Sequence, residues 1–175
     1  MFRLIKYLPL FILVFSSCKN TPRKSIRENQ LIEASKQQYM LEWNRRMTEQ
    51  QDSLFKIIAD SSVFSWTKAD NGYYYTLQDS ENGQVVTSGD VVTINLILNT
   101  ILNEPVDSIV STFVVGKSQD IPLGIQHAVL QMRKDQTGSF LFPFNLAYGV
   151  KGIPGKVVPF QPLRVKITIE KVEKR

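Results

Sequence analysis

Residues 163–172 read LRVKITIEKV, and this stretch carries the clearest strand pattern in the chain. Its apolar residues alternate with polar or charged ones, at Leu163, Val165, Ile167 and Ile169. Because successive side chains of a strand point to opposite faces, such alternation is typical of an antiparallel sheet with one wet face. The stretch therefore predicts a strand that covers a core with one face.

The same pattern recurs upstream. VVTINLIL, residues 91–98, places Val92, Ile94, Leu96 and Leu98 on one face. GYYYTLQD, STFVVGK and GSFLFPF predict further strands, and HAVLQM, residues 127–132, predicts a short helix. We therefore expect an α+β fold, with an antiparallel β-sheet wrapped on one short helix and preceded by a long N-terminal helix.

The N-terminal helix is predicted over residues 30–60, which contain neither Gly nor Pro. Its apolar stripe consists of Met40, Trp43, Met47, Leu54 and Ile58. Phe55 and Ile57 widen this stripe, whereas Gln50 and Gln51 interrupt it. Two interpretations stay open. The helix either packs on its own domain or stands as a stalk, or it binds a partner, including a second copy in a homodimer.

The first residues, MFRLIKYLPLFILVFSSC, predict an export signal, because Arg3 and Lys6 accompany an apolar run too short to span a bilayer. Cys18 is the only cysteine, so no internal disulfide is expected. FSSC resembles a bacterial lipobox, which implies cleavage before Cys18 and lipid attachment to its thiol. The alternative is a signal peptide with a chance cysteine beside it.

Composition and motifs exclude several function classes. The net charge is +5, but Lys19, Arg23, Lys24 and Arg27 cluster in a short polar segment, so nucleic-acid binding is not predicted. His127 is the single histidine and has no Cys or acid cluster near it in the sequence, so no metal site is expected. No phosphate-binding glycine loop or hydrolase triad is recognisable, and no cofactor is expected.

FLFPFNLAYGVKGIPGKVVPF, residues 140–160, contains no acid and no histidine. Rotation about an X–Pro amide is a reaction that needs neither, since no bond breaks. Its barrier of about 18–20 kcal/mol comes from amide resonance, which the twisted state has lost. An apolar pocket with one hydrogen-bond donor would favour that twisted state.

The motif LAYGVKGIPG followed by VP resembles the AYG…G…IPP segment of FKBP-type peptidyl-prolyl isomerases. The resemblance extends, in the same order, to SGDVVTINLIL, VDS, FVVGK, IPLGIQHAVLQM and LRVKITIEKV, and covers about residues 72–175. Within the family, the lipobox and helical prefix most resemble the lipoprotein isomerases associated with gliding motility. The implied organisation is a signal peptide (1–17), a polar tether (18–29), a helical extension (30–62) and an isomerase domain (63–175).

The resemblance implies the site residues. Tyr148 matches the tyrosine whose hydroxyl donates to a bound carbonyl, and Asp107 matches the pocket carboxylate. The apolar wall would consist of Leu96, Val106, Phe113, Ile121, Ile125, Val157 and Val165.

The chain also departs from the family at the pocket. Aliphatic residues replace family aromatics at Leu96, Val106, Ile125 and Val165, and Pro122 has no N–H where the family's backbone often donates. These changes predict weak catalysis. They leave open a non-catalytic lipoprotein that acts as a chaperone or as a partner-binding module of a surface or gliding machinery.

Partners and location follow from the same resemblances. The expected clients are proline-containing exported polypeptides. The expected location is the bacterial cell envelope, with the chain anchored in the membrane through lipidated Cys18 and facing the periplasm from the outer membrane.

Overall fold

The computed structural model describes residues 26–78 and 82–174. The predicted signal peptide and Cys18 lie outside the described residues. The chain divides into two compact units, Met1–Tyr39 and Met40–Arg175. Within the described part of the chain, no helix has both the length and the apolar content needed to cross a membrane.

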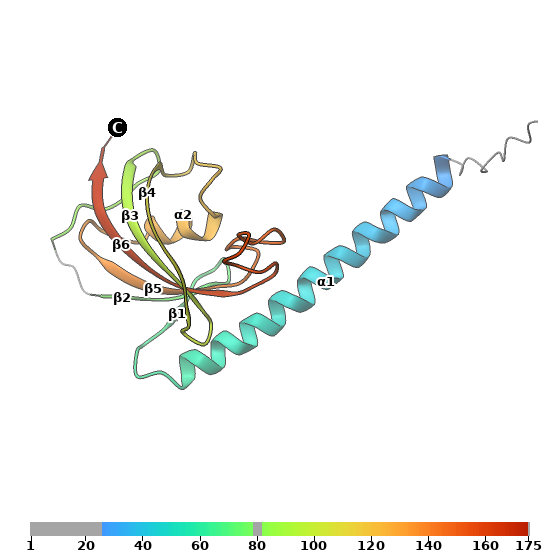
Figure 1. Cartoon of the computed structure of the whole chain (residues 1–175), viewed down its shortest axis with the longest axis horizontal. Helices are drawn as coiled ribbons and strands as arrows, with labels where there is room; N and C mark the ends of the chain where they lie inside the picture. Colours follow the sequence, from blue (N-terminus) through green and yellow to red (C-terminus); the bar gives the residue numbers. More distant parts are fainter. Residues whose placement is uncertain (1–25, 79–81, 175) are drawn as a thin grey trace, which may run out of the picture. The chain divides into compact units, whose positions relative to one another are not determined.

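The larger unit is built on a six-stranded antiparallel sheet with the order β1-β2-β5-β6-β3-β4 (Figure 1). The strands are β1 (Thr67–Lys68), β2 (Tyr74–Leu77), β3 (Val91–Thr100), β4 (Pro105–Val114), β5 (Thr137–Phe142) and β6 (Leu163–Glu173). One short helix, α2 (Leu123–Val129), packs its buried residues into the main core with the strands. The predicted α+β fold is confirmed.

The alternating strands are confirmed residue by residue. The apolar faces of β3 and β6 are almost fully buried, at Val92, Ile94, Leu96, Leu98, Leu163, Val165, Ile167 and Ile169. The two strands pair directly, with Leu96 opposite Ile167 and Leu98 opposite Val165. Period-2 patterning predicted these strands because burial of one whole face leaves a strong signal in the sequence.

The short helix lies earlier than predicted. It begins at Leu123, directly after Pro122, and ends at Val129, whereas the prediction was 127–132. Proline suits a helix start, because its fixed φ is compatible with a helix and the first N–H groups of a helix have no partner within it. Residues 130 and 131 form a turn instead, and Met132 is buried in the core.

Strand β4 was only partly predicted. The sequence indicated a strand in STFVVGK, but β4 begins at Pro105 and includes Asp107. As one of the two edge strands of the sheet, β4 pairs with β3 alone, and Phe113 is its one buried residue. An edge strand buries little and therefore leaves weak alternation in its sequence.

The long helix α1 (Ile26–Asp60) is confirmed and begins four residues earlier than predicted. From Met40 onward it belongs to the larger unit. Phe55 is fully buried with Tyr74 and Leu141, on the sheet face opposite the main core. Two details were wrong: Ile57, expected to widen the stripe, is 65% exposed, and Gln51, expected to interrupt it, is buried.

Candidate functional site

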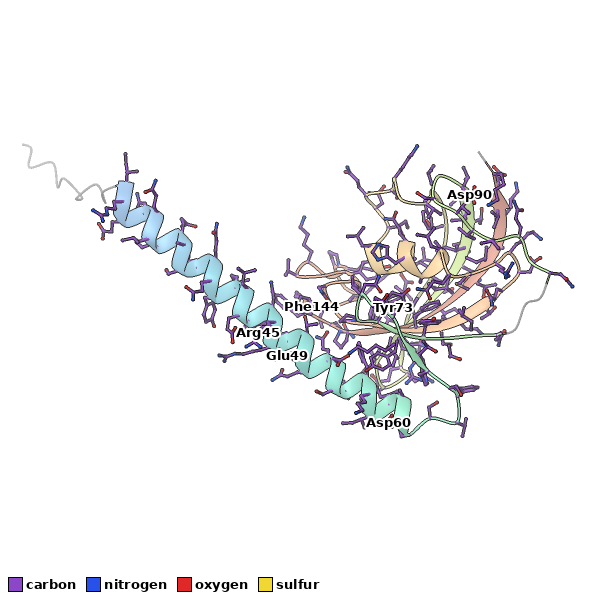
Figure 2. All side chains as sticks on the ribbon, turned by 180° about the vertical axis from the view of Figure 1, so that it is seen from behind. Arg45, Glu49, Asp60, Tyr73, Asp90 and Phe144 are labelled. Carbon is purple, nitrogen blue, oxygen red and sulfur yellow. The ribbon has the colours of Figure 1, made fainter. Side chains whose placement is uncertain are left out.

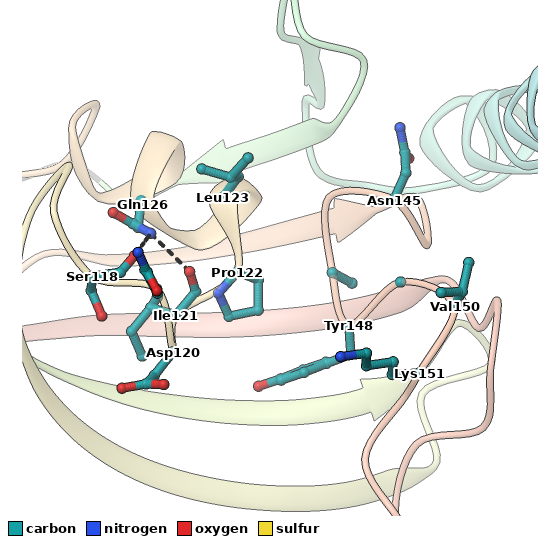
Figure 3. A pocket seen from close by; sticks show the side chains of 13 residues that line it. Ser118, Asp120, Ile121, Pro122, Leu123, Gln126, Asn145, Tyr148, Val150 and Lys151 are labelled. Atoms are coloured by element: carbon teal, nitrogen blue, oxygen red, sulfur yellow. Dashed lines mark hydrogen bonds between the residues drawn. The ribbon is translucent and has the colours of Figure 1, made fainter.

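A cavity of about 580 Å³ opens between two loop segments of the larger unit. One wall is formed by Ser118–Leu123 together with Gln126, and the other by Asn145 and Ala147–Lys151 (Figure 3). The first segment precedes and enters α2, and the second follows β5. The second wall therefore contains part of the stretch whose lack of acids and bases distinguished it in the sequence.

The first wall is held by the buried side chain of Gln126 on α2. Its Nε2 donates to the carbonyl oxygens of Ser118 and Ile121, both at 2.8 Å (Figure 3). Its Oε1 accepts a hydrogen bond from the N–H of Gly116 at 3.0 Å. All three bonds satisfy backbone groups of an irregular loop, so one amide fixes the shape of the wall.

Tyr148 is the main polar side chain of the second wall. Its ring extends across the cavity toward the wall that carries Asp120 (Figure 3). Burial raises the pKa of the Tyr148 hydroxyl, and the nearby charge of Asp107 raises it further. The phenol therefore stays protonated at neutral pH and can donate a hydrogen bond to a carbonyl in the cavity.

Asp107 lies on β4 and is paired with a residue of the loop after Tyr148. Its Oδ2 lies 2.7 Å from the Nζ of Lys156, with the Asp107 side chain 17% exposed and the Lys156 side chain 50% exposed. The hydrogen bond from Lys156 lowers the pKa of Asp107, and the Ser108 N–H contributes in the same direction. Asp107 is therefore an ionised, occupied acceptor at neutral pH and is poorly suited to act as a base.

The predicted apolar wall residues share one hydrophobic cluster. Val106, Ile121 and Tyr148 are partly buried and pack against it, whereas Leu96, Phe113, Ile125, Val157 and Val165 are buried members of the cluster. Of the predicted residues, Ile121 and Tyr148 line the cavity. The structure thus brings the set together, but the five buried members fill the core.

Sequence reasoning missed several residues of the site. Leu123 and Val150 are exposed apolar residues that line the cavity on opposite walls. Lys156 was not identified because its partner Asp107 is 49 positions away and no local pattern connects them. Gln126 lies in the quoted motif IPLGIQHAVLQM, but a glutamine there gives no sign of the three backbone groups that it binds.

The family model for FKBP-type peptidyl-prolyl cis-trans isomerases matches residues 83–170. Among curated proteins, the peptidyl-prolyl cis-trans isomerase Mip of Coxiella burnetii is 30% identical over 114 residues. That match covers 60% of this chain and 46% of Mip, so the chain spans about half the length of the curated relative.

Solved structures show the same fold at low sequence identity. FkpA from Escherichia coli is 17% identical with a TM-score of 0.60, over 86% of this chain and 74% of FkpA. A peptidyl-prolyl cis-trans isomerase from Pseudomonas syringae pv. tomato DC3000 is 16% identical with a TM-score of 0.57, over 78% of this chain and 96% of that protein. At these identities the likeness establishes the fold.

Proposed function

Because the chain belongs to the FKBP-type peptidyl-prolyl cis-trans isomerase family, we propose that it catalyses cis–trans isomerisation of X–Pro peptide bonds. The observation that carries this proposal is the position of Tyr148. Its partly buried, protonated hydroxyl lies in a cavity beside the apolar side chains of Ile121 and Leu123. An apolar surface with one well-placed donor is the arrangement that amide rotation requires.

In the proposed reaction, the substrate proline contacts the apolar residues of the cavity and Tyr148 donates to the carbonyl before it. The twisted amide has lost resonance and some charge separation, so removal from water favours it over the planar form. No proton is transferred. Asp107 stays ionised against Lys156 and acts on the site through its charge and by shaping the loop.

A proline-limited refolding assay with the full chain tests this function. We expect the chain to accelerate refolding and the Tyr148→Phe variant to be roughly 3- to 10-fold less active, because loss of a neutral hydrogen bond costs about 1 kcal/mol. Tyr39→Phe is the matched control, since Tyr39 is an exposed tyrosine on α1. A wild-type rate equal to that in buffer would contradict the proposal, and full activity of Tyr148→Phe would exclude its hydroxyl as the donor.

A non-catalytic binding module is the second candidate, and the packing of the predicted wall favours it. Leu96, Ile125 and Val165 are at most 1% exposed, so they offer little surface to a proline ring, whereas Leu123 and Val150 are exposed. Such a module would bind unfolded chains or a partner of a surface or gliding machinery. Binding to a permanently unfolded protein without acceleration of refolding would support this candidate over the first.

We also propose a location and an organisation for the chain. The clients would be proline-containing exported proteins. Lipidated Cys18 would anchor the chain at the periplasmic side of the outer membrane, after removal of residues 1–17 and through the tether 18–29, whose last residues, 26–29, form the start of α1. The lipobox resemblance supports this anchor, and the helical extension (30–62) and isomerase domain (63–175) complete the organisation.

A homodimer formed through helix 30–60 is a further part of the proposal. Its support is the exposure of large apolar residues on α1, among them Leu31, Tyr39 and Leu41. Light scattering should show a dimer for the full chain and a monomer for a Leu31→Glu, Leu41→Glu double variant. A monomeric wild-type chain would contradict the dimer and leave the isomerase proposal unaffected.

A further inference from the structure

The backbone on either side of Tyr148 is part of a closed ring of four hydrogen bonds. The N–H of Gly149 donates to the carbonyl of Phe144 at 2.8 Å, and the N–H of Phe160 donates to the carbonyl of Gly149 at 3.0 Å. The other two bonds come from the side-chain amide of Gln51 on α1. Its Oε1 accepts from the N–H of Phe144 at 2.9 Å, and its Nε2 donates to the carbonyl of Phe160 at 3.2 Å.

Gln51 is suited to close this ring by its chemistry. A backbone N–H can only donate and a backbone carbonyl can only accept, so the partners fix the orientation of the amide. The residue is 6% exposed, so water does not readily replace either bond. An apolar side chain here would leave a buried donor and a buried acceptor without partners, which costs more than the bonds themselves contribute.

Aromatic packing fixes the same two points of the loop on α1. The ring centroid of Trp43 lies 4.4 Å from that of Phe160 and 6.2 Å from that of Phe144, and both pairs pack edge to face. Figure 2 shows Phe144 close to the part of α1 that carries Arg45 and Glu49. Phe160 has a φ of 62°, a left-handed conformation that a non-glycine residue rarely adopts, so its backbone must be held by its surroundings.

We propose that Gln51 is a positioning residue for Tyr148, so that helix α1 forms part of the frame of the isomerase site. Gln51 lies outside the family-matched range 83–170, whereas the three backbone residues of its ring lie inside it. Opening the ring would release Gly149 and shift the hydroxyl of the adjacent Tyr148. This inference rests on the proposed isomerase function for its effect on catalysis, but the ring itself can be measured separately.

The test compares Gln51→Met, which cannot hydrogen-bond to the loop, with Gln50→Met, a change at the exposed neighbouring glutamine. We expect Gln51→Met to lower kcat/KM by roughly 3-fold, a loss no larger than that of Tyr148→Phe because it weakens the same hydrogen bond, and Gln50→Met to match wild type. In a Tyr148→Phe background, Gln51→Met should have little further effect, because it acts through that hydroxyl. An equal loss in both backgrounds would overturn the proposal.

Gln51→Glu gives a second readout that a general loss of stability would not produce. Its carboxylate can accept from Phe144 but cannot donate to Phe160, whereas the protonated carboxyl can do both. The activity of Gln51→Glu relative to wild type should therefore rise as the pH is lowered, and that of Gln51→Met should not. A constant ratio for Gln51→Glu across the range in which it stays folded would overturn the proposal.

Amide hydrogen exchange distinguishes failure of this inference from failure of the proposed function. If the wild-type chain has no isomerase activity, the function is wrong, and exchange then decides the positioning role. Faster exchange of the Phe144 and Gly149 amides in Gln51→Met, with the amides of β3 and β6 unchanged, would support it. Unchanged exchange at Phe144 and Gly149 would overturn it.

Discussion

The Nζ of Lys156 lies 2.7 Å from the Oδ2 of Asp107 and joins the loop after Tyr148 to the edge strand β4. The pair crosses 49 positions of sequence, and its carboxylate is close enough to Tyr148 to raise the pKa of that hydroxyl. This ion pair therefore attaches the loop to β4, and its carboxylate helps to keep the hydroxyl of Tyr148, the proposed donor, protonated. It also keeps Asp107 ionised and paired, in agreement with the proposed reaction, which transfers no proton.

Removal of the Lys156 ammonium group should change the pKa of Asp107. Lys156→Met should raise the pKa of Asp107, since the hydrogen bond from Lys156 is the largest cause of its lowered value. A lowered carboxyl pKa contributes stability above the unfolded-state pKa near 3.8, and this contribution is lost as the pH falls through the folded-state pKa. Lys156→Met should therefore lack that contribution at neutral pH. Carbon-13 NMR of the Asp107 carboxyl measures the shift.

Lys151→Met is the control for this titration, because Lys151 lies on the same loop but has no part in the shift at Asp107. Its Asp107 titration should match wild type. If Asp107 titrates identically in Lys156→Met, the ion pair does not form in solution.

The sequence predicted the parts of the fold in which burial is periodic. β3 and β6 lie in the middle of the sheet and bury one whole face, so every second residue is apolar and their side-chain directions followed directly. The edge strand β4 was predicted only at its end, because Phe113 is its one buried residue. The start of α2 was missed because the prediction followed the apolar residues of HAVLQM, whereas the helix begins directly after Pro122.

The candidate site was less predictable, because its key contacts join distant residues through polar groups. Gln51 looked like a break in an apolar stripe, yet it binds backbone groups 93 and 109 positions away. Lys156 looked like an ordinary loop lysine. The resemblance placed Asp107, Tyr148 and the apolar residues in one region, but burial in the core depends on packing that the sequence pattern does not specify.

Core packing at the predicted wall can be tested on two adjacent residues of β3. Leu96 is 1% exposed and Ile97, on the opposite face, is 38% exposed. Leu96→Ala should lower the free energy of unfolding by about 2–5 kcal/mol, because it removes buried methyl groups and leaves a cavity. Ile97→Ala should cost less than about 1 kcal/mol. Chemical denaturation measures both, and equal losses would contradict the assigned faces of the strand.

The proposed lipid anchor depends on one thiol. Cys18→Ala should prevent lipid attachment, so that metabolic labelling with a radioactive fatty acid no longer marks the chain and the precursor is not cleaved before residue 18. Fractionation of expressing cells should then show a changed membrane association. Full labelling of the variant would place the lipid elsewhere, and no labelling of the wild type would exclude the anchor.

Two glycines of the loop separate backbone strain from crowding near the site. Gly152 has a φ of +63° and Gly155 a φ of +73°, so alanine at either costs about 1–2 kcal/mol of left-handed strain. A Cβ at Gly155 has no atom within 4 Å, whereas a Cβ at Gly152 would overlap the carbonyl oxygen of Val157. That oxygen accepts from the Ile153 N–H at 2.8 Å, so Gly152→Ala must distort the turn that carries Lys156.

Gly152→Ala should therefore change the pKa of Asp107 and the rate of the proposed isomerase reaction, whereas Gly155→Ala should change neither. Both variants should lose a similar part of their stability through strain, but displacement of Lys156 in Gly152→Ala should raise the pKa of Asp107 and lower the isomerase rate. In Gly155→Ala, the Asp107 titration and the rate per folded molecule should stay near wild type. Calorimetry, carboxyl NMR and the refolding assay on the same samples provide the comparison. Equal rates and equal Asp107 titrations for the two variants would show that the loop absorbs the overlap without moving Lys156, and that its geometry does not control the site.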